Sequence, residues 1–301
     1  MTGAEKGFLL LTSRLGDPGR KPLTVAQFRE LTRRVKTMTS REALRDIDIL
    51  DLTSIGYAES FARHILALLQ DEQLLKHYMR QAKKANCFPI TRASEQYPTA
   101  VRQRLGTDSP GVLWAKGDSA ILELPKVSLV GNRDLQNHNA AFAVEVGLQA
   151  ARQGYVLVSG NARGADQLAQ DACLYAGGKV ISVVADSLAE HKKTKNVLYL
   201  SENGFEEGFT AQRALSRNRT IHCLGAVTFV AQCKLGQGGT WDGTRKNLCH
   251  RWSPVYCYAD GSPAQQTLVE MGAQTVTIEQ LRDFSALPKP VADIFHREET
   301  I

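Results

Sequence analysis

Two glycine-rich turns carry the residue types that best suit an anionic ligand. They are Gly131-Asn132-Arg133 and Ser159-Gly160-Asn161-Ala162-Arg163-Gly164-Ala165-Asp166. Glycine lets the backbone turn sharply and approach a ligand, and a helix that follows such a turn presents unpaired N–H groups with a partial positive charge. Arg133 and Arg163 add forked donors that suit phosphate oxygens. We therefore predict a phosphate- or nucleotide-binding site here, the alternative being that the glycines serve only tight connections.

Two neighbouring features bear on the same ligand. Asp166 either contacts a ribose or base edge, or caps the helix that begins near Gly164. A third glycine-rich turn, residues 236–243, contains Gly238, Gly239 and Thr240, which suit phosphate cradling at a strand-to-helix junction. The alternative for this third turn is a flexible loop.

Basic residues gather in two segments between the second and third turns. Arg213 and Arg217-Asn218-Arg219 fall on one expected helix, where a spacing of four places Arg213 and Arg217 on the same face. Lys192 and Lys193 lie in a loop before them. Each cluster alone is typical of a solvated face. Together with the arginines of the turns they predict a basic groove along one edge of a sheet.

The motifs of several other ligand classes are absent from the sequence. The first turn lacks the GxGxxG pattern of dinucleotide sites, and no Walker A motif supports ATP hydrolysis. No serine or cysteine stands with a spaced base, and the six cysteines form no CxxC pair. We therefore expect no catalytic residue, no metal and no cofactor, and a binding protein rather than an enzyme.

The elements that position the turns follow from periodicity. From residue 126 onward, short apolar runs alternate with helical patterns, and the expected strands are Val127–Val130, Tyr155–Val158, Val180–Val184, Val197–Leu200, Ala226–Val230, Val255–Tyr258 and Thr275–Ile278. Strands separated by helices predict an α/β fold with a doubly wound, mostly parallel sheet of Rossmann-like type. The run 112–117 is expected as a further strand at the edge of that sheet.

The first 85 residues predict a small all-helical domain. Val25, Phe28, Leu31 and Val35 recur at helical spacing behind a cap at Thr24, and two more helices are expected over 61–69 and 74–82. The segment 54–57 between helices suits either a helix-hairpin-helix turn or a simple connection. We thus expect domains at 1–85 and 86–285, with a C-terminal tail over 286–301.

Composition limits the cellular setting and the class of partner. The chain has 301 residues, of which 43% are hydrophobic and 23% charged, as in ordinary globular proteins. Its 37 Lys and Arg against 31 Asp and Glu give a net charge of +6, which suits a polyanion such as nucleic acid. The apolar run 7–11 is too short for a signal peptide and no stretch approaches a membrane span. We expect a cytoplasmic protein without a membrane partner.

In this order the turns resemble the DNA-processing protein A (DprA, or Smf) family. The likeness covers roughly residues 88–280 and includes the 90–98 and 110–117 segments, the two turns, Ser201-Glu202 and Arg217-Asn218-Arg219. The sequence departs from the family at Gln170, where histidine is usual, and at Asn161, where leucine is usual. The tyrosine-proline element after the third strand is replaced by His191-Lys192-Lys193-Thr194-Lys195, and no winged helix follows residue 285.

The resemblance implies a Rossmann-like domain preceded by a sterile-alpha-motif-like or helix-hairpin-helix domain. It also implies a homodimer that binds single-stranded DNA and acts in recombination with a RecA-like recombinase. Arg133, Arg163, Arg217 and Arg219 would contact DNA phosphates or line the pocket, and Ser159, Gly160, Gly164 and Asp166 would shape it. The wider superfamily includes cytokinin-activating phosphoribohydrolases and nucleotide-sensing modules of antiviral systems. The alternative is therefore a nucleotide sensor, or an N-glycoside hydrolase with Glu202 or Asp242 as the acid.

Overall fold

The computed structural model describes residues 1–38 and 47–288. The chain forms two compact units. Unit 1 comprises Met1–Glu123 and Ser182–Arg217, and unit 2 comprises Leu124–Ile181 and the chain from Asn218 onward. From residue 289 on, the expected C-terminal tail lies outside the described residues.

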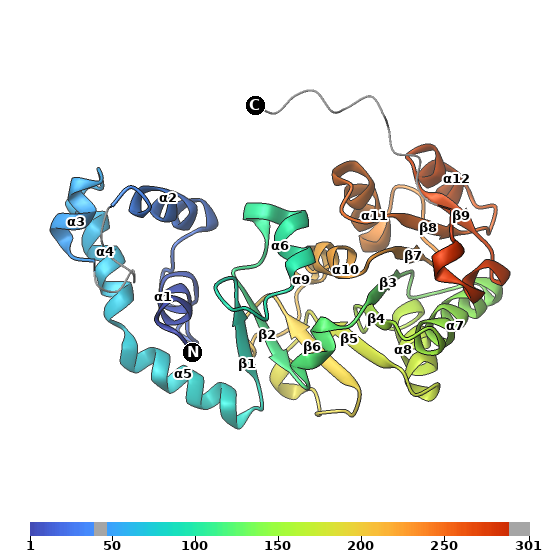
Figure 1. Cartoon of the computed structure of the whole chain (residues 1–301), viewed down its shortest axis with the longest axis horizontal. Helices are drawn as coiled ribbons and strands as arrows, with labels where there is room; N and C mark the ends of the chain where they lie inside the picture. The colour runs from blue at the N-terminus through green and yellow to red at the C-terminus, as the bar shows by residue number, and fades with distance from the viewer. Residues whose placement is uncertain (39–46, 289–301) are drawn as a thin grey trace. The chain divides into compact units, whose positions relative to one another are not determined.

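The described residues form a nine-stranded sheet in the order β1-β2-β6-β5-β4-β3-β7-β8-β9 (Figure 1). Its strands are β1 (Phe88–Thr91), β2 (Val112–Lys116), β3 (Lys126–Val130), β4 (Val156–Ser159), β5 (Lys179–Val183), β6 (Val197–Ser201), β7 (Thr228–Val230), β8 (Val255–Tyr258) and β9 (Gln274–Val276). Strand β3 pairs in parallel with β4 and β7, and β7, β8 and β9 continue in parallel, whereas β2 is antiparallel to β1 and β6. The predicted doubly wound, mostly parallel Rossmann-like sheet is confirmed.

Helices flank the parallel strands of unit 2. They are α7 (Asn137–Arg152), α8 (Ala165–Tyr175), α10 (Asn218–Leu224), α11 (Gly238–His250) and α12 (Pro263–Glu270). In Figure 1, α7 and α8 lie below the strands while α11 lies above them. The backbones of α7 and α8 meet at Gly147, where a Cβ would stand 2.1 Å from the carbonyl oxygen of Ala169. This close pairing fixes the two helices that follow the first two turns.

Unit 1 joins helices and strands around one core. Its helices are α1 (Gly3–Thr12), α2 (Val25–Val35), α3 (Ile49–Ser54), α4 (Glu59–Gln70), α5 (Glu72–Lys84), α6 (Thr99–Leu105) and α9 (Ala211–Ser216). The predicted helices appear as α2, α4 and α5, and the Thr24 side chain caps α2 by accepting from Gln27 N. Trp114 of β2 and Phe205 share a hydrophobic core with the α1 residues Phe8–Leu11. The helical part is thereby anchored on the antiparallel strands.

Two local expectations were wrong. Strand β2 lies inside the sheet because β1, which the sequence patterns did not predict, pairs with its outer side. The expected single helix through Arg213 and Arg219 is two helices, because α9 ends at its C-cap Arg217 and α10 begins at Asn218.

Candidate functional site

The first turn lies at the topological switch point of the sheet. Strands β4, β5 and β6 extend to one side of β3, whereas β7, β8 and β9 extend to the other, and ligands of open parallel sheets bind beyond the carboxyl ends of the strands at such a point. Gln232, which follows β7, holds this turn: its carbonyl accepts from Asn132 N at 3.0 Å and its side-chain oxygen accepts from Gln136 N at 3.0 Å. Gln232 was not among the predicted site residues, and its signal in the sequence is a polar side chain close behind a buried strand.

The first and second turns cross at the distance of backbone contact. A Cβ on Gly164 would stand 2.3 Å from the carbonyl oxygen of Arg133 and 2.5 Å from that of Asn132. A Cβ on Gly131 would stand 2.4 Å from the Cβ of Ala165, and Ala165 N donates to the Asn132 carbonyl at 3.1 Å. Both glycines are therefore required for the turns to touch.

Polar side chains hold the second turn from inside. Asp166 is 5% exposed, and its Oδ2 accepts from Gly160 N at 3.1 Å and from Ala162 N at 3.2 Å. It therefore organises the turn that precedes its helix. The fully buried Ser159 accepts a hydrogen bond from the Gln170 side chain. Asn161 has a φ of +59°, a left-handed conformation that asparagine tolerates better than leucine.

The third turn is attached to the first. The hydroxyl of Thr240, in the first turn of α11, donates to the carbonyl of Gly131 at 3.0 Å. The carbonyl of Gly239 accepts from the side-chain amide of Asn218 at 3.0 Å. Gly238, the first residue of α11, is exposed. The structure therefore brings the N-terminus of α11 next to the crossing of the other two turns.

Cations and donors gather at these three turns. Arg163 reaches the first turn, where its guanidinium pairs with Asp134 at 2.8 Å. The two side chains are 74% and 81% exposed, so the pair contributes little stability and leaves Arg163 accessible to a phosphate. Arg133 is exposed as well. The side-chain Nδ2 of Asn132 is buried without a hydrogen-bond partner among the described residues.

The other predicted basic residues have different environments. In unit 2, Arg219 of α10 is partly buried. In unit 1, Arg217 is 8% exposed, and Arg213 is held by the Glu207 carboxylate and the Gly208 carbonyl. The pKa of Asp186 is lowered first by its hydrogen bond to His191 and further by the charge of Arg217.

Lys192 and Lys193 are exposed in the segment before β6. Their neighbour His191 bonds to Asp186 at 2.9 Å and stacks on Tyr199 with ring centroids 4.7 Å apart. This anchors the segment at one end while the lysines stay in solvent.

The two acidic residues expected for the alternative hydrolase function are bonded to other side chains of the protein. Asp242 pairs with Lys246 at 2.8 Å on its own helix, and Glu202 accepts from the Ser216 hydroxyl at 3.1 Å. Among residues 1–38 and 47–288, no three His, Cys, Asp or Glu side chains gather as a metal site. No helix in the same ranges is long and apolar enough to cross a bilayer.

Fold and turns together define a Rossmann-like α/β protein whose candidate ligand edge lies at the carboxyl ends of β3, β4 and β7. The chain belongs to the DNA recombination-mediator protein A family, whose model matches residues 88–285. It is 34% identical over 141 residues to DNA processing protein DprA of Streptococcus pneumoniae (strain ATCC BAA-255 / R6), covering 44% of this chain and 50% of that protein. It is 32% identical over 165 residues to DprA of Bacillus subtilis (strain 168), covering 51% of this chain and 54% of that protein. The matches therefore span about half the length of these curated relatives.

Solved structures show the same fold. The X-ray structure of DprA from Streptococcus pneumoniae superposes with a TM-score of 0.70 at 24% identity, covering 93% of this chain and 96% of that one. A DprA structure from Helicobacter pylori, described as giving insights into a unique single-stranded DNA binding mode, has a TM-score of 0.56 at 25% identity and covers 65% of this chain and 94% of that one. The family resemblance predicted from the sequence is confirmed.

Proposed function

We propose that this protein binds single-stranded DNA as a DNA-processing or recombination protein, and that the three turns of unit 2 hold its phosphates. The Arg163–Asp134 contact carries the proposal, because it brings the arginine of the second turn onto the first. The N-termini of α8 and α11 add partial positive charge at the same edge. Family membership and the single-stranded DNA named for the Helicobacter pylori relative support the choice of ligand.

A salt titration with a long oligonucleotide tests the proposal. Each phosphate contact on a single strand contributes about −0.7 to the slope of log K against log salt. Replacement of Arg163 by alanine should reduce that slope by about 0.7 and weaken binding about fivefold to tenfold at low salt. Arg63→Ala is the matched control, since Arg63 is also an exposed arginine paired with one carboxylate, Glu59. Binding that is flat with salt, or equal losses in both variants, would refute the proposal.

We also propose the wider setting that the family implies. The protein would act in the cytoplasm as a homodimer and would work beside a RecA-like recombinase, without enzymatic activity of its own. Light scattering of the purified chain tests the dimer, and pull-down with a RecA-like recombinase in the presence of single-stranded DNA tests the partner. A monomer at all concentrations would overturn the first, and no capture would overturn the second.

A further inference from the structure

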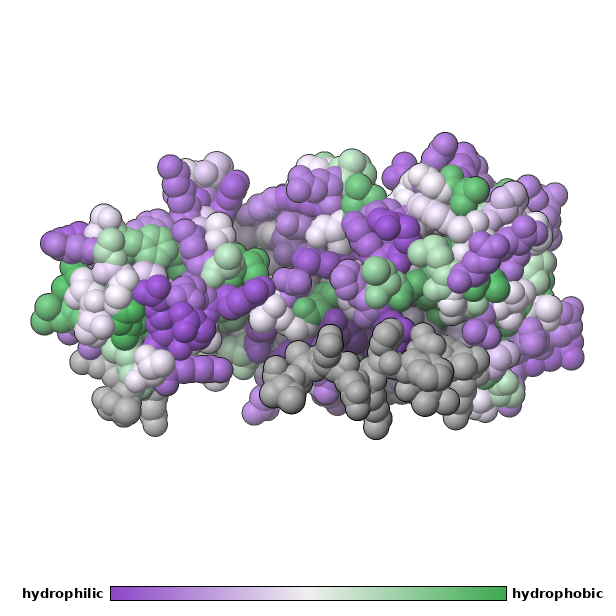
Figure 2. Space-filling view, turned by 90° about the horizontal axis from the view of Figure 1, so that it is seen from above, coloured by the Kyte–Doolittle hydropathy of each residue, from purple (hydrophilic) through white to green (hydrophobic). Residues whose placement is uncertain are grey.

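Unit 1 contains a cavity of 1040 Å³. Its walls include residues of α1, α2 and the segments 12–16, 107–114 and 202–207. Figure 2 shows the surface hollowed beside the helical part, with hydrophilic and hydrophobic residues along the margin. Ligand pockets usually measure about 300–1,000 Å³, so the cavity is large enough for a ligand of nucleotide size.

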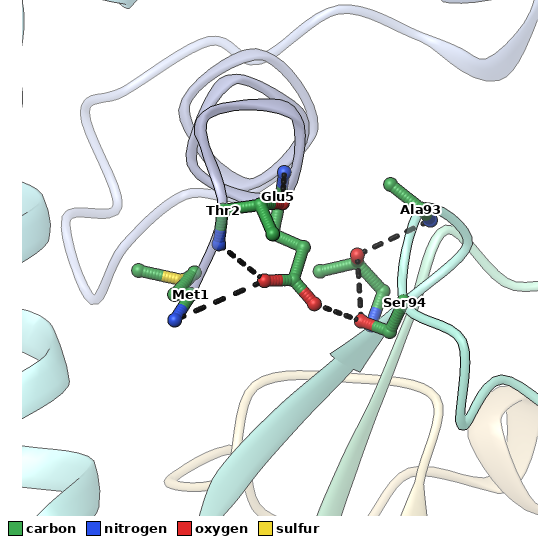
Figure 3. A network of polar contacts seen from close by, with 6 residues as sticks. Met1, Thr2, Glu5, Ala93 and Ser94 are labelled. Carbon is green, nitrogen blue, oxygen red and sulfur yellow. Dashed lines mark hydrogen bonds and ion pairs between the residues drawn. The ribbon is translucent and has the colours of Figure 1, made fainter.

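The walls of the cavity are held in place. The Ser94 hydroxyl donates to the carboxylate of Glu5 at 2.6 Å, which ties the first turn of α1 to the segment after β1 (Figure 3). The hydroxyl of Tyr78 donates to Glu206 at 2.7 Å. Gly111 leaves room for Phe8, whose ring would stand 2.9 Å from a Cβ at that position. The cavity is therefore a preformed space between closely fitted elements.

One wall of the cavity is cationic. Arg29, Arg33 and Lys36 follow each other along α2 and its C-cap at spacings of four and three, which places them on one helix face, and all three line the cavity and are exposed. Arg29 pairs with Asp108 at 3.3 Å and Arg33 with Glu30 at 2.7 Å. Such exposed pairs are weak, so the side chains can turn to an anionic group. A phosphate matches this wall.

The remaining surface suits a planar, hydrogen-bonding group. Phe8 and the half-buried Phe28 line the cavity with ring centroids 4.6 Å apart, whereas Tyr78 and Trp114, which also line it, are 1% and 2% exposed and offer little ring surface. The Glu202 carboxylate also lines the cavity. Aromatic side chains favour the faces and edges of a base, and a carboxylate accepts from its amino groups.

We propose that this cavity binds one nucleotide, with its phosphate on the α2 face and its base among the aromatic side chains. The nucleotide is either a free mononucleotide or one unit of a bound strand. The strand-bound form rests on the proposed function, whereas the free form does not. In the strand-bound form, the helical part of the chain adds a second contact to the DNA.

Two measurements on the full chain distinguish these sources. Titration calorimetry with deoxyadenosine monophosphate tests a free nucleotide, and photo-crosslinking of a bromodeoxyuridine-containing single strand, with mass spectrometry, tests a strand. The double variant Arg29→Ala/Lys36→Ala should weaken the mononucleotide about tenfold or more, or remove the cross-link to the peptide that contains Phe28. Ala4→Trp, which fills the cavity from α1 without removing a charge, should do the same.

Two controls keep this test separate from the one on the three turns. Lys76→Ala removes an exposed lysine of α5 that does not line the cavity, and Arg163→Ala acts at the turns. Lys76→Ala should change neither mononucleotide binding nor the cross-link at Phe28, and Arg163→Ala should leave mononucleotide binding unchanged. A nucleotide signal lost in Arg163→Ala but kept in the cavity variants would overturn the proposal, as would the absence of both heat and cross-link. In both of these outcomes, salt-dependent strand binding that requires Arg163 would still support the proposed function of the three turns.

Discussion

The crossing of the first two turns predicts a large penalty for the substitution Gly164→Ala. Gly164 has φ +91° and ψ −127°, a region essentially restricted to glycine, and strain of this kind costs about 1–3 kcal/mol. The new Cβ would also stand 2.3 Å from a carbonyl oxygen, where real Cβ atoms keep at least 3.0 Å. Forcing such an overlap apart costs about another 1–3 kcal/mol. A smaller gain from the stiffer unfolded chain, about 0.4–1 kcal/mol, offsets part of this. The expected net loss is about 1–5 kcal/mol.

Gly177→Ala supplies the matched control for this prediction. Gly177 follows the same helix, α8, and has a φ of +79°, but nothing lies within 4 Å of the place that a Cβ would take. It should therefore show backbone strain alone, about 1–2 kcal/mol. Urea unfolding followed by far-UV circular dichroism gives both values, and oligonucleotide binding of the folded variants shows whether the turns still present Arg133 and Arg163. Equal losses in the two variants would refute the close crossing of the turns.

Four further changes test individual contacts. Burial lowers the pKa of His222 from 6.5 to about 3, so between these two values the unfolded chain binds a proton that the folded chain does not. The free energy of unfolding should therefore fall by about 1.4 kcal/mol per pH unit between about pH 6.5 and pH 3. His222→Asn should flatten that slope in urea titrations. Asp166→Ala should cost about 1–3 kcal/mol in the same assay, because two backbone N–H groups lose their acceptor. Thr240→Val should cost about 0.5–1.5 kcal/mol through the lost bond to the first turn. The hydrogen bond from Ser94 is the largest cause that lowers the pKa of Glu5. This contact therefore stabilises the fold at pH values above the ordinary carboxyl pKa, and the stabilisation is lost as the pH falls through the lowered pKa of Glu5. Ser94→Ala should raise the pKa of Glu5 in a carboxyl NMR titration.

Each of these predictions has a contrary result. If the pH dependence of the unfolding free energy is unchanged in His222→Asn, then His222 is not the group that makes the stability sensitive to acid. Wild-type urea midpoints for Asp166→Ala or Thr240→Val would show that these bonds do not hold the turns. An unshifted Glu5 titration in Ser94→Ala would remove the hydroxyl as the cause of its lowered pKa.

Local sequence patterns predicted the elements whose side chains repeat regularly. The buried parallel strands β3, β4 and β8 appear as apolar runs because both of their faces are covered. Helix α2 shows its cap at Thr24 and its period. Strand β1 escaped prediction because it is short and contains Pro89, which edge strands tolerate. Helix α1 was not predicted as an individual helix because a helix that is buried over consecutive residues shows no alternation of polar and apolar faces.

The sequence by itself determined the Rossmann-like class, the family and the three turns, since glycines, arginines and strand endings are local features. Only the tertiary structure decided how those features combine. The four-residue spacing of Arg213 and Arg217 predicted one cationic helix face, but α9 ends at Arg217, and the carboxylate of Glu207, which precedes that helix, holds Arg213. Asn161 and Gln170, which depart from the family pattern, proved to shape the second turn. Contacts between distant segments, such as Gly164 against the first turn, depend on packing that no local pattern encodes.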